Sequence, residues 1–101
     1  MRGRGGLVLM TKSIDDGRAL YRRALDVRGR YPSLPPAQAD WLNAQTEMHW
    51  ALTELARRDC TEARARVTAG LAIAGRLPPG AGTESLMEQY RAVVAKAAEC
   101  R

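Results

Sequence analysis

The stretch that decides the fold is HWALTELARRDCTEARARV, residues 49–67. It carries the end of one helix, a tight corner and the start of another, because apolar residues recur at helical spacing on both sides of the corner. Asp59 stands where a helix N-cap is expected, and Glu62 follows three residues later, as in a capping box. A connection this short places the two helices side by side and antiparallel. The stretch therefore predicts a helical hairpin.

The same reasoning extends to both ends of the chain and predicts four helices. Ser13 and Asp16 form a second capping box, and prolines stand at 32, 35 and 36 and in the LPPGAG run, residues 77–82. The expected helices are residues 13–30, 34–58, 59 to the LPPGAG run, and 83 or 85 to the C-terminus. No alternating stretch is long enough for a strand. We expect an all-α protein, an antiparallel four-helix array, with one domain over residues 13–101 and a flexible basic leader over residues 1–12.

The formal net charge of +5 lies entirely in the first third of the chain. Residues 1–30 carry eight basic residues against three Asp, whereas residues 31–101 carry eight of each sign. Such asymmetry indicates an anionic partner, nucleic acid or another polyanion. The alternative is a solvated helix face, because Arg22, Asp26 and Arg30 are spaced for i,i+4 pairing. The candidate polyanion-binding residues are Arg2, Arg4, Lys12, Arg18, Arg22 and Arg23.

The N-terminus, MRGRGGLVLMTKS, combines a basic start with the apolar residues 7–10. This run is shorter than the roughly 7–15 residues of a secretory segment, and no stretch approaches the ~18 apolar residues of a membrane span. Met10 is an alternative start, which would leave residues 1–9 outside the native protein. All basic residues except Lys12 and Lys96 are Arg, which is typical of a GC-rich, bacterial genome. We expect a cytoplasmic protein with no membrane partner.

The central hairpin resembles the tetratricopeptide family of helix-turn-helix repeats. WALTELARRDCTEARARVTAGLAIAG, residues 50–75, matches the family's spacing at Ala51, Asp59, Ala63, Val67, Gly70 and Leu71. GRALYRRALDVRGRYP, residues 17–32, resembles the second helix of such a repeat. The resemblance covers about one and a half repeats and implies a right-handed stack of helix pairs that contacts other proteins. It places the ligand face on residues 40–58, and it requires the last helix or a partner subunit to cover the open side.

Trp50 is the residue that fits the helical pattern least. It lies about half a turn from the apolar face of its helix, which holds Trp41, Ala44, Met48, Ala51, Leu52 and Leu55. Exposed tryptophans are favoured in interface hot spots, so we predict a partner-binding surface at Trp50. Its members would be Trp50, His49, Thr46, Arg57 and Asn43. The alternative is that residues 7–10 or the C-terminal helix folds over the indole.

Side chains able to do chemistry are few, and we expect neither an enzyme nor a cofactor. The lone histidine, His49, has no metal-ligand pattern around it. Glu47 and Glu54 share a helix face but lack a basic or nucleophilic counterpart, so we expect a solvated face. The glycines of GRGG, residues 3–6, are not followed by a phosphate-binding strand and helix.

Cys60 and Cys100 are equidistant from the turn centred near Gly80, so they should meet at one end of the last hairpin. A disulfide between them would close a loop worth roughly 4 kcal/mol. A cytosolic protein would instead keep both thiols reduced, and the sequence leaves the two states open.

Two functions from different classes fit these observations. The first is a non-enzymatic helical interaction module, an adaptor or a small subunit or inhibitor of a larger assembly, which binds another protein or a second copy of itself through Trp50. The second is nucleic-acid or polyanion binding by the basic N-terminal third.

Overall fold

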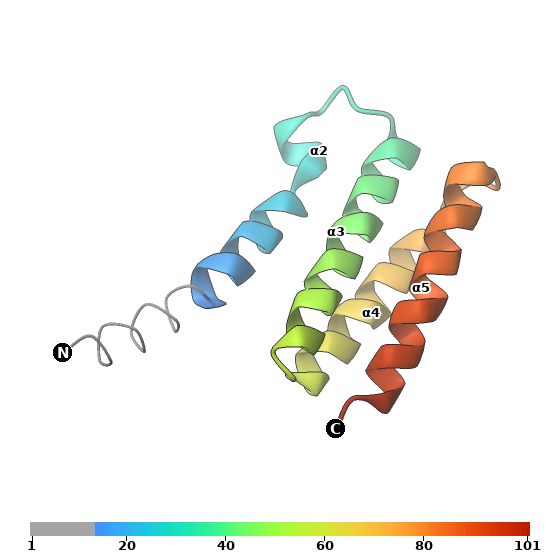
Figure 1. Ribbon diagram of the computed structural model, residues 1–101. Helices are drawn as coiled ribbons and strands as arrows, with labels where there is room; N and C mark the ends of the chain where they lie inside the picture. The colour runs from blue at the N-terminus through green and yellow to red at the C-terminus, as the bar shows by residue number, and fades with distance from the viewer. Residues whose placement is uncertain (1–13) are drawn as a thin grey trace.

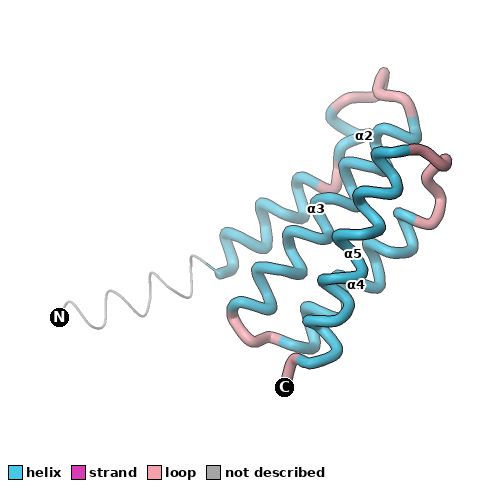
Figure 2. The backbone as a smooth tube through the Cα atoms, turned by 45° about the vertical axis from the view of Figure 1, so that its right-hand side comes forward, coloured by secondary structure: helices cyan, strands magenta, loops and turns pink. Residues whose placement is uncertain are grey.

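The computed structural model describes residues 14–101, and within this range the chain forms helices and no strand. Residues 14–24 are helical and precede α2 (Val27–Arg30), α3 (Pro36–Ala56), α4 (Cys60–Ala74) and α5 (Ala81–Glu99). In Figure 1, α3 runs through the centre, with residues 14–24 and α2 on one side and α5 on the other, while α4 lies behind. The tube in Figure 2 shows the same helices side by side, joined by short loops. The predicted all-α class and hairpin arrangement are confirmed.

The predicted helix over residues 13–30 is wrong at residues 25–26. The structure interrupts it there, because Asp26 takes a non-helical backbone conformation and stands at the N-cap of α2. Aspartate favours such positions over helix interiors, since its side chain competes for backbone hydrogen bonds. The break turns α2 so that Val27 is buried. The expected cap at Ser13 lies outside the described residues.

The corner after α3 is close to the prediction, although α3 is two residues shorter at each end. Pro36 begins α3, where a proline costs no intrahelical hydrogen bond. Arg58 follows the helix with a φ of 62°, the left-handed conformation that usually belongs to glycine. Asp59 then caps α4, because its carboxylate accepts a 3.1 Å hydrogen bond from the backbone N–H of Glu62. The predicted N-cap is thus confirmed.

The main core lies between α3, α4 and α5. Its buried members are Ala44, Met48, Ala51, Val67, Ala74, Leu86, Tyr90, Val93 and Ala97. Small buried residues on α4, such as Ala63, Gly70 and Ala74, allow the neighbouring helices to approach closely. A Cβ on Gly70 would overlap the Tyr90 hydroxyl and come within 3.0 Å of the Glu47 Cβ. The Tyr90 hydroxyl in turn donates a hydrogen bond to the carbonyl of Ala44, which ties α5 to α3.

No helix in the described range is both long and apolar enough to cross a bilayer.

Candidate functional site

Trp50 is buried, so the prediction that it faces solvent is wrong. Only 1% of it is exposed. Tyr21, from the helical residues 14–24, stacks on the indole with ring centroids 5.6 Å apart, and the Arg66 guanidinium of α4 lies 4.4 Å from the ring centroid. These covering groups come from residues 14–24 and α4, and not from the C-terminal helix; residues 7–10, the other cover that the alternative proposed, lie outside the described residues. Because α3 has neighbours on several sides, the arc that looked solvent-facing is an internal contact.

Glu54 is a buried carboxylate at the centre of a charge cluster, and the prediction of a solvated face is wrong for it. Its carboxylate accepts hydrogen bonds from Arg18 Nε at 2.7 Å, from Trp50 Nε1 at 3.0 Å and from Arg57 Nη1 at 3.3 Å. Arg18 also reaches Asp59 at 3.0 Å. Burial alone would raise the pKa of Glu54, but these hydrogen bonds and the positive charges of the two arginines outweigh it and lower that pKa. We call these five residues the Glu54 cluster.

Glu47 is a second buried carboxylate, again contrary to the solvated face. It is 2% exposed and faces Arg66, whose Nη1 lies 3.4 Å from Glu47 Oε1. Arg66 also pairs with Glu62 at 3.3 Å. Burial raises the pKa of Glu47, and Arg66 offsets only part of that effect. Neither buried carboxylate is paired with a nucleophile, and each is held by arginine.

The other predicted members of the Trp50 surface do not gather around an exposed indole. His49 is exposed, while Asn43 is half-buried. The hydroxyl of Thr46 is also half-buried and donates to the carbonyl of Leu42. Arg57 lies at the surface but directs its guanidinium to Glu54.

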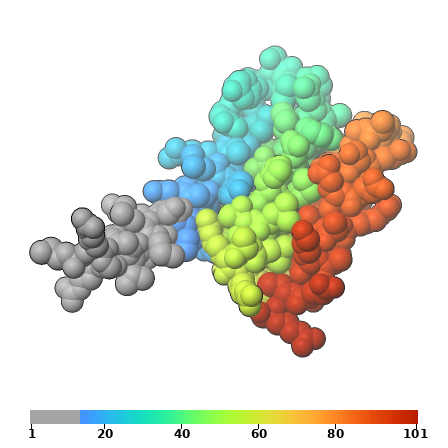
Figure 3. Space-filling view, in the orientation of Figure 1, coloured from blue at the N-terminus to red at the C-terminus, as the bar shows by residue number. Residues whose placement is uncertain are grey.

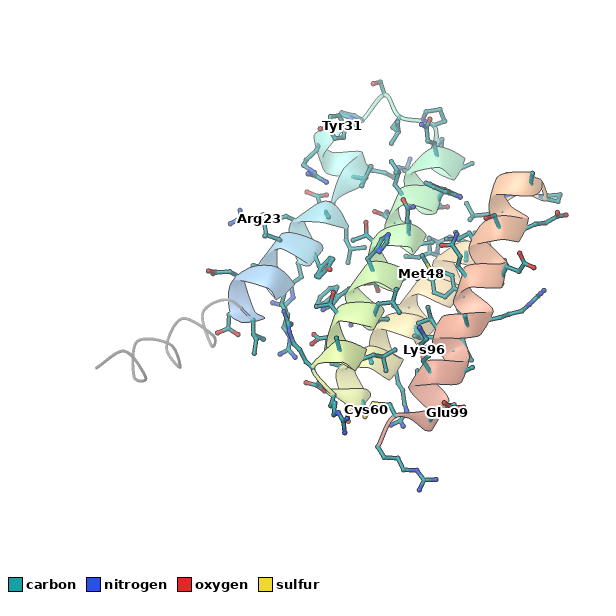
Figure 4. The ribbon with its side chains drawn as sticks, viewed as in Figure 1. Arg23, Tyr31, Met48, Cys60, Lys96 and Glu99 are labelled. Carbon is teal, nitrogen blue, oxygen red and sulfur yellow. A yellow bond between two sulfur atoms is a disulfide. The ribbon has the colours of Figure 1, made fainter. Side chains whose placement is uncertain are left out.

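The predicted polyanion-binding set loses a member. The guanidinium of Arg18 pairs with the carboxylates of Glu54 and Asp59, so it is not available to a phosphate. Arg22 is exposed with its guanidinium 5.8 Å from the Trp50 ring centroid, and Arg23 is exposed at the flank of the molecule (Figure 4). Arg30 donates to the backbone carbonyls of residues 24 and 26 and makes no ion pair with Asp26 among the described residues. Arg2, Arg4 and Lys12 lie outside the described residues.

Cys60 and Cys100 are joined by a disulfide, with Cα atoms 5.6 Å apart. The predicted meeting at one end of the hairpin is confirmed, and Figure 4 shows Cys60 beside the last turn of α5. Arg64 holds the same chain end, because its side chain donates to the carbonyls of Ala97 at 3.1 Å and of Cys100 at 2.6 Å. The C-terminus is thus fastened twice to the start of α4.

Sequence reasoning missed a surface site at the other tryptophan. Trp41, assigned to the core, is partly exposed and lines an apolar hollow of about 360 Å³. We call this the Trp41 hollow; its remaining wall residues are Ala37, Gln38, Leu77, Pro78, Pro79, Gly80, Gly82 and Thr83. The indole N–H points to the carbonyl of Gly82 at 3.5 Å. The signal that could have found it is the LPPGAG run, since prolines cannot extend α4 over the indole.

Sequence reasoning missed a second site, which lies where α3 and α5 end. It is a hollow of about 430 Å³, which we call the Arg58 pocket, lined by Leu55, Arg58, Lys96, Glu99, Cys100 and Arg101. Among the described residues, none of its four charged side chains forms an ion pair. Figure 4 places Lys96 and Glu99 on the last turns of α5. In the space-filling view of Figure 3, atoms of α3 lie directly against atoms of α5, and we call this boundary the α3–α5 seam.

Within residues 14–101, no three His, Cys, Asp or Glu side chains are placed to hold a metal ion.

Comparison with known proteins connects the chain to no family. No family model matches it, and no curated protein or solved structure is significantly similar to it.

Proposed function

We propose that the protein is a non-enzymatic helical module that binds another protein along the α3–α5 seam, and not around Trp50. The observation that supports this is Trp41, which presents part of its indole in an apolar hollow. Tryptophan is among the residues most enriched in interface hot spots. Leu77, Pro78 and Pro79 make the opposite wall, so the hollow suits an apolar side chain of the partner.

The seam is built on elements that are already held in place. α3 is fixed on one flank by the Glu54 cluster and on the other by the Tyr90 hydroxyl, and the disulfide anchors the end of α5. A surface that is rigid before binding loses little conformational entropy when a partner docks. This favours recognition of a segment by the folded module over folding upon binding.

The tetratricopeptide-like reading is compatible with this site and stays part of the proposal. It places the ligand face on residues 40–58, and Trp41 lies in that range. The module would act as an adaptor or a small subunit or inhibitor of a larger assembly. The cytoplasmic location stays a prediction, against which the disulfide weighs, because disulfides persist mainly in oxidising compartments.

Selection of peptides on the full chain tests the proposal. A displayed library of random peptides, about twelve residues long, supplies binders whose affinities are then measured by calorimetry. We expect binders with an apolar anchor, and Trp41→Ala should weaken them more than about 10-fold, as for a hot-spot residue. Tyr31→Ala is the matched control, because Tyr31 is an aromatic residue 58% exposed and outside both hollows.

The outcomes separate the alternatives. Circular dichroism must show that both variants keep their helicity. Binders that tolerate Trp41→Ala, or a library that yields no binder, would contradict the proposal. Light scattering decides whether the partner is a second copy of the chain, in which case Trp41→Ala would dissociate an oligomer.

A further inference from the structure

We infer that the Arg58 pocket binds a carboxylate from an acidic side chain of the same partner segment whose apolar side chain fills the Trp41 hollow. This inference rests on the proposed function and specifies the chemistry of the partner.

The charge around the pocket calls for an anion. Arg58 comes from the corner after α3, Lys96 from α5 and Arg101 from the C-terminus, and Glu99 is the one carboxylate among the lining side chains. Like charges gathered in one hollow repel one another, and a bound anion removes that repulsion. Four other arginines of the described chain, Arg18, Arg57, Arg66 and Arg76, pair with carboxylates of the protein itself. Arg58, Lys96 and Arg101 form no such pair within the described chain, and they share one hollow.

The backbone holds these cations in place. Arg58 occupies a left-handed position that glycine fills at lower cost, so an arginine there is locally unfavourable for the fold. Cys100 and Arg101 extend beyond the end of α5, yet the disulfide and the two Arg64 hydrogen bonds keep Cys100 against α4. The disulfide consequently keeps the backbone at Cys100 near the corner that carries Arg58.

The shape favours an acidic peptide over a nucleic acid. Leu55 gives the pocket an apolar wall, and Glu99, which also lines it, would repel a continuous row of phosphates. The volume of about 430 Å³ suits one or two side chains. A single carboxylate can approach the cations while its methylene groups contact Leu55.

The seam also fixes the spacing within the partner segment. Leu55 follows Trp41 by fourteen positions in α3, which corresponds to about 21 Å along a helix. An extended peptide covers this distance with about six or seven residues. The partner should therefore carry an acidic residue six or seven positions from its apolar anchor.

The pocket is tested first with small probes. Proton–nitrogen correlation spectra of the full chain are recorded during titration with N-acetylglutamate amide, inorganic phosphate and a single-stranded oligothymidylate. We expect the carboxylate to shift the backbone amides of Arg58, Cys100 and Arg101 without moving the Trp41 indole signal. Lys96→Glu should abolish these shifts, whereas Arg91→Glu should preserve them, because Arg91 lies on α5 but outside the pocket. No response at the pocket amides, or an oligothymidylate that binds more tightly than acidic peptides, would overturn the inference.

Peptides that carry an apolar anchor then test whether one partner segment binds both sites. Adding a glutamate six or seven positions from the anchor should tighten binding by about 5-fold or more, and Lys96→Glu should remove that gain. Peptides that need Trp41 but ignore both the glutamate and Lys96→Glu would overturn the inference and leave the proposed function standing. Carboxylate shifts at the pocket without any Trp41-dependent peptide would support the anion site and count against the proposed function.

Discussion

The indole N–H of Trp50 donates a 3.0 Å hydrogen bond to the carboxylate of Glu54, and both side chains are almost fully buried, at 1% and 0% exposure. A buried carboxylate is costly unless charged and polar groups surround it. Here they come from two segments: Arg18 from the helical residues 14–24, and Trp50 and Arg57 from α3 and its C-cap. The Glu54 cluster therefore fastens the N-terminal helical residues to the rest of the fold.

Glu54→Gln should destabilise the protein by about 3 kcal/mol, because it leaves the buried ends of Arg18 and Trp50 without their anionic partner. Urea unfolding followed by circular dichroism measures the change. Asp40→Asn is the matched control, since Asp40 pairs with an Arg76 that is mostly exposed, and such surface pairs contribute little. A loss for Glu54→Gln as small as that of the control would show that the cluster does not hold the fold.

The two buried carboxylates should respond to acid in opposite directions. The lowered pKa of Glu54 means that its ionised form stabilises the fold at neutral pH, and this stability is lost as the pH falls through that lowered pKa. The raised pKa of Glu47 means that its ionised form costs stability above that pKa, and acid relieves the cost.

Unfolding free energies between pH 3 and 7 check this difference. Glu47→Gln should leave the stability at pH 7 unchanged or higher, whereas Glu54→Gln should lower it and remove most of the loss of stability in acid. The interpretation fails if Glu47→Gln destabilises the protein at pH 7 as much as Glu54→Gln does.

The parts of the fold that were predictable depend on local signals. Asp59, Glu62 and the prolines define helix ends through neighbours within a few residues, so the hairpin and its corner were correct. The cysteine pair was found because two antiparallel helices of similar length bring equidistant residues together.

The parts that failed depend on contacts distant in sequence. A helical wheel assumes one buried face, but α3 contacts residues 14–24, α4 and α5. Polar neighbours made the arc of Trp50 look solvated, while the cation that neutralises Glu54 stands 36 positions away at Arg18. The Trp41 hollow and the Arg58 pocket likewise combine the ends of α3 with segments near residues 77–83 and 96–101.

Trp50 is buried although it was predicted to lie at the surface, and Trp41 lines a surface hollow although it was assigned to the apolar face. Fluorescence can measure these two environments. Trp41→Phe leaves Trp50 as the sole indole, and we expect a blue-shifted emission that acrylamide quenches weakly, because Trp50 is buried. Trp50→Phe leaves Trp41, whose emission should lie further to the red and be quenched more strongly, since Trp41 lines a surface hollow. The reverse order would contradict the placement of both residues.

The disulfide should affect both stability and the Arg58 pocket. Replacing both Cys60 and Cys100 with Ser opens a loop with a sequence separation of 40, so the chain-entropy estimate predicts a loss of roughly 4 kcal/mol. The core contacts of α5 through Leu86, Tyr90 and Val93 remain, and helicity at low temperature should persist.

Without the disulfide, Cys100 and Arg101 are held to α4 by Arg64 alone, so the carboxylate-induced shift at the Arg58 amide should need a several-fold higher probe concentration. Thermal unfolding and the same titration provide the two readouts, and Thr68→Ser, an exposed hydroxyl substitution on α4, is the control. If the serine variant loses stability but binds the carboxylate as well as the native protein, the disulfide serves the fold and does not shape the pocket.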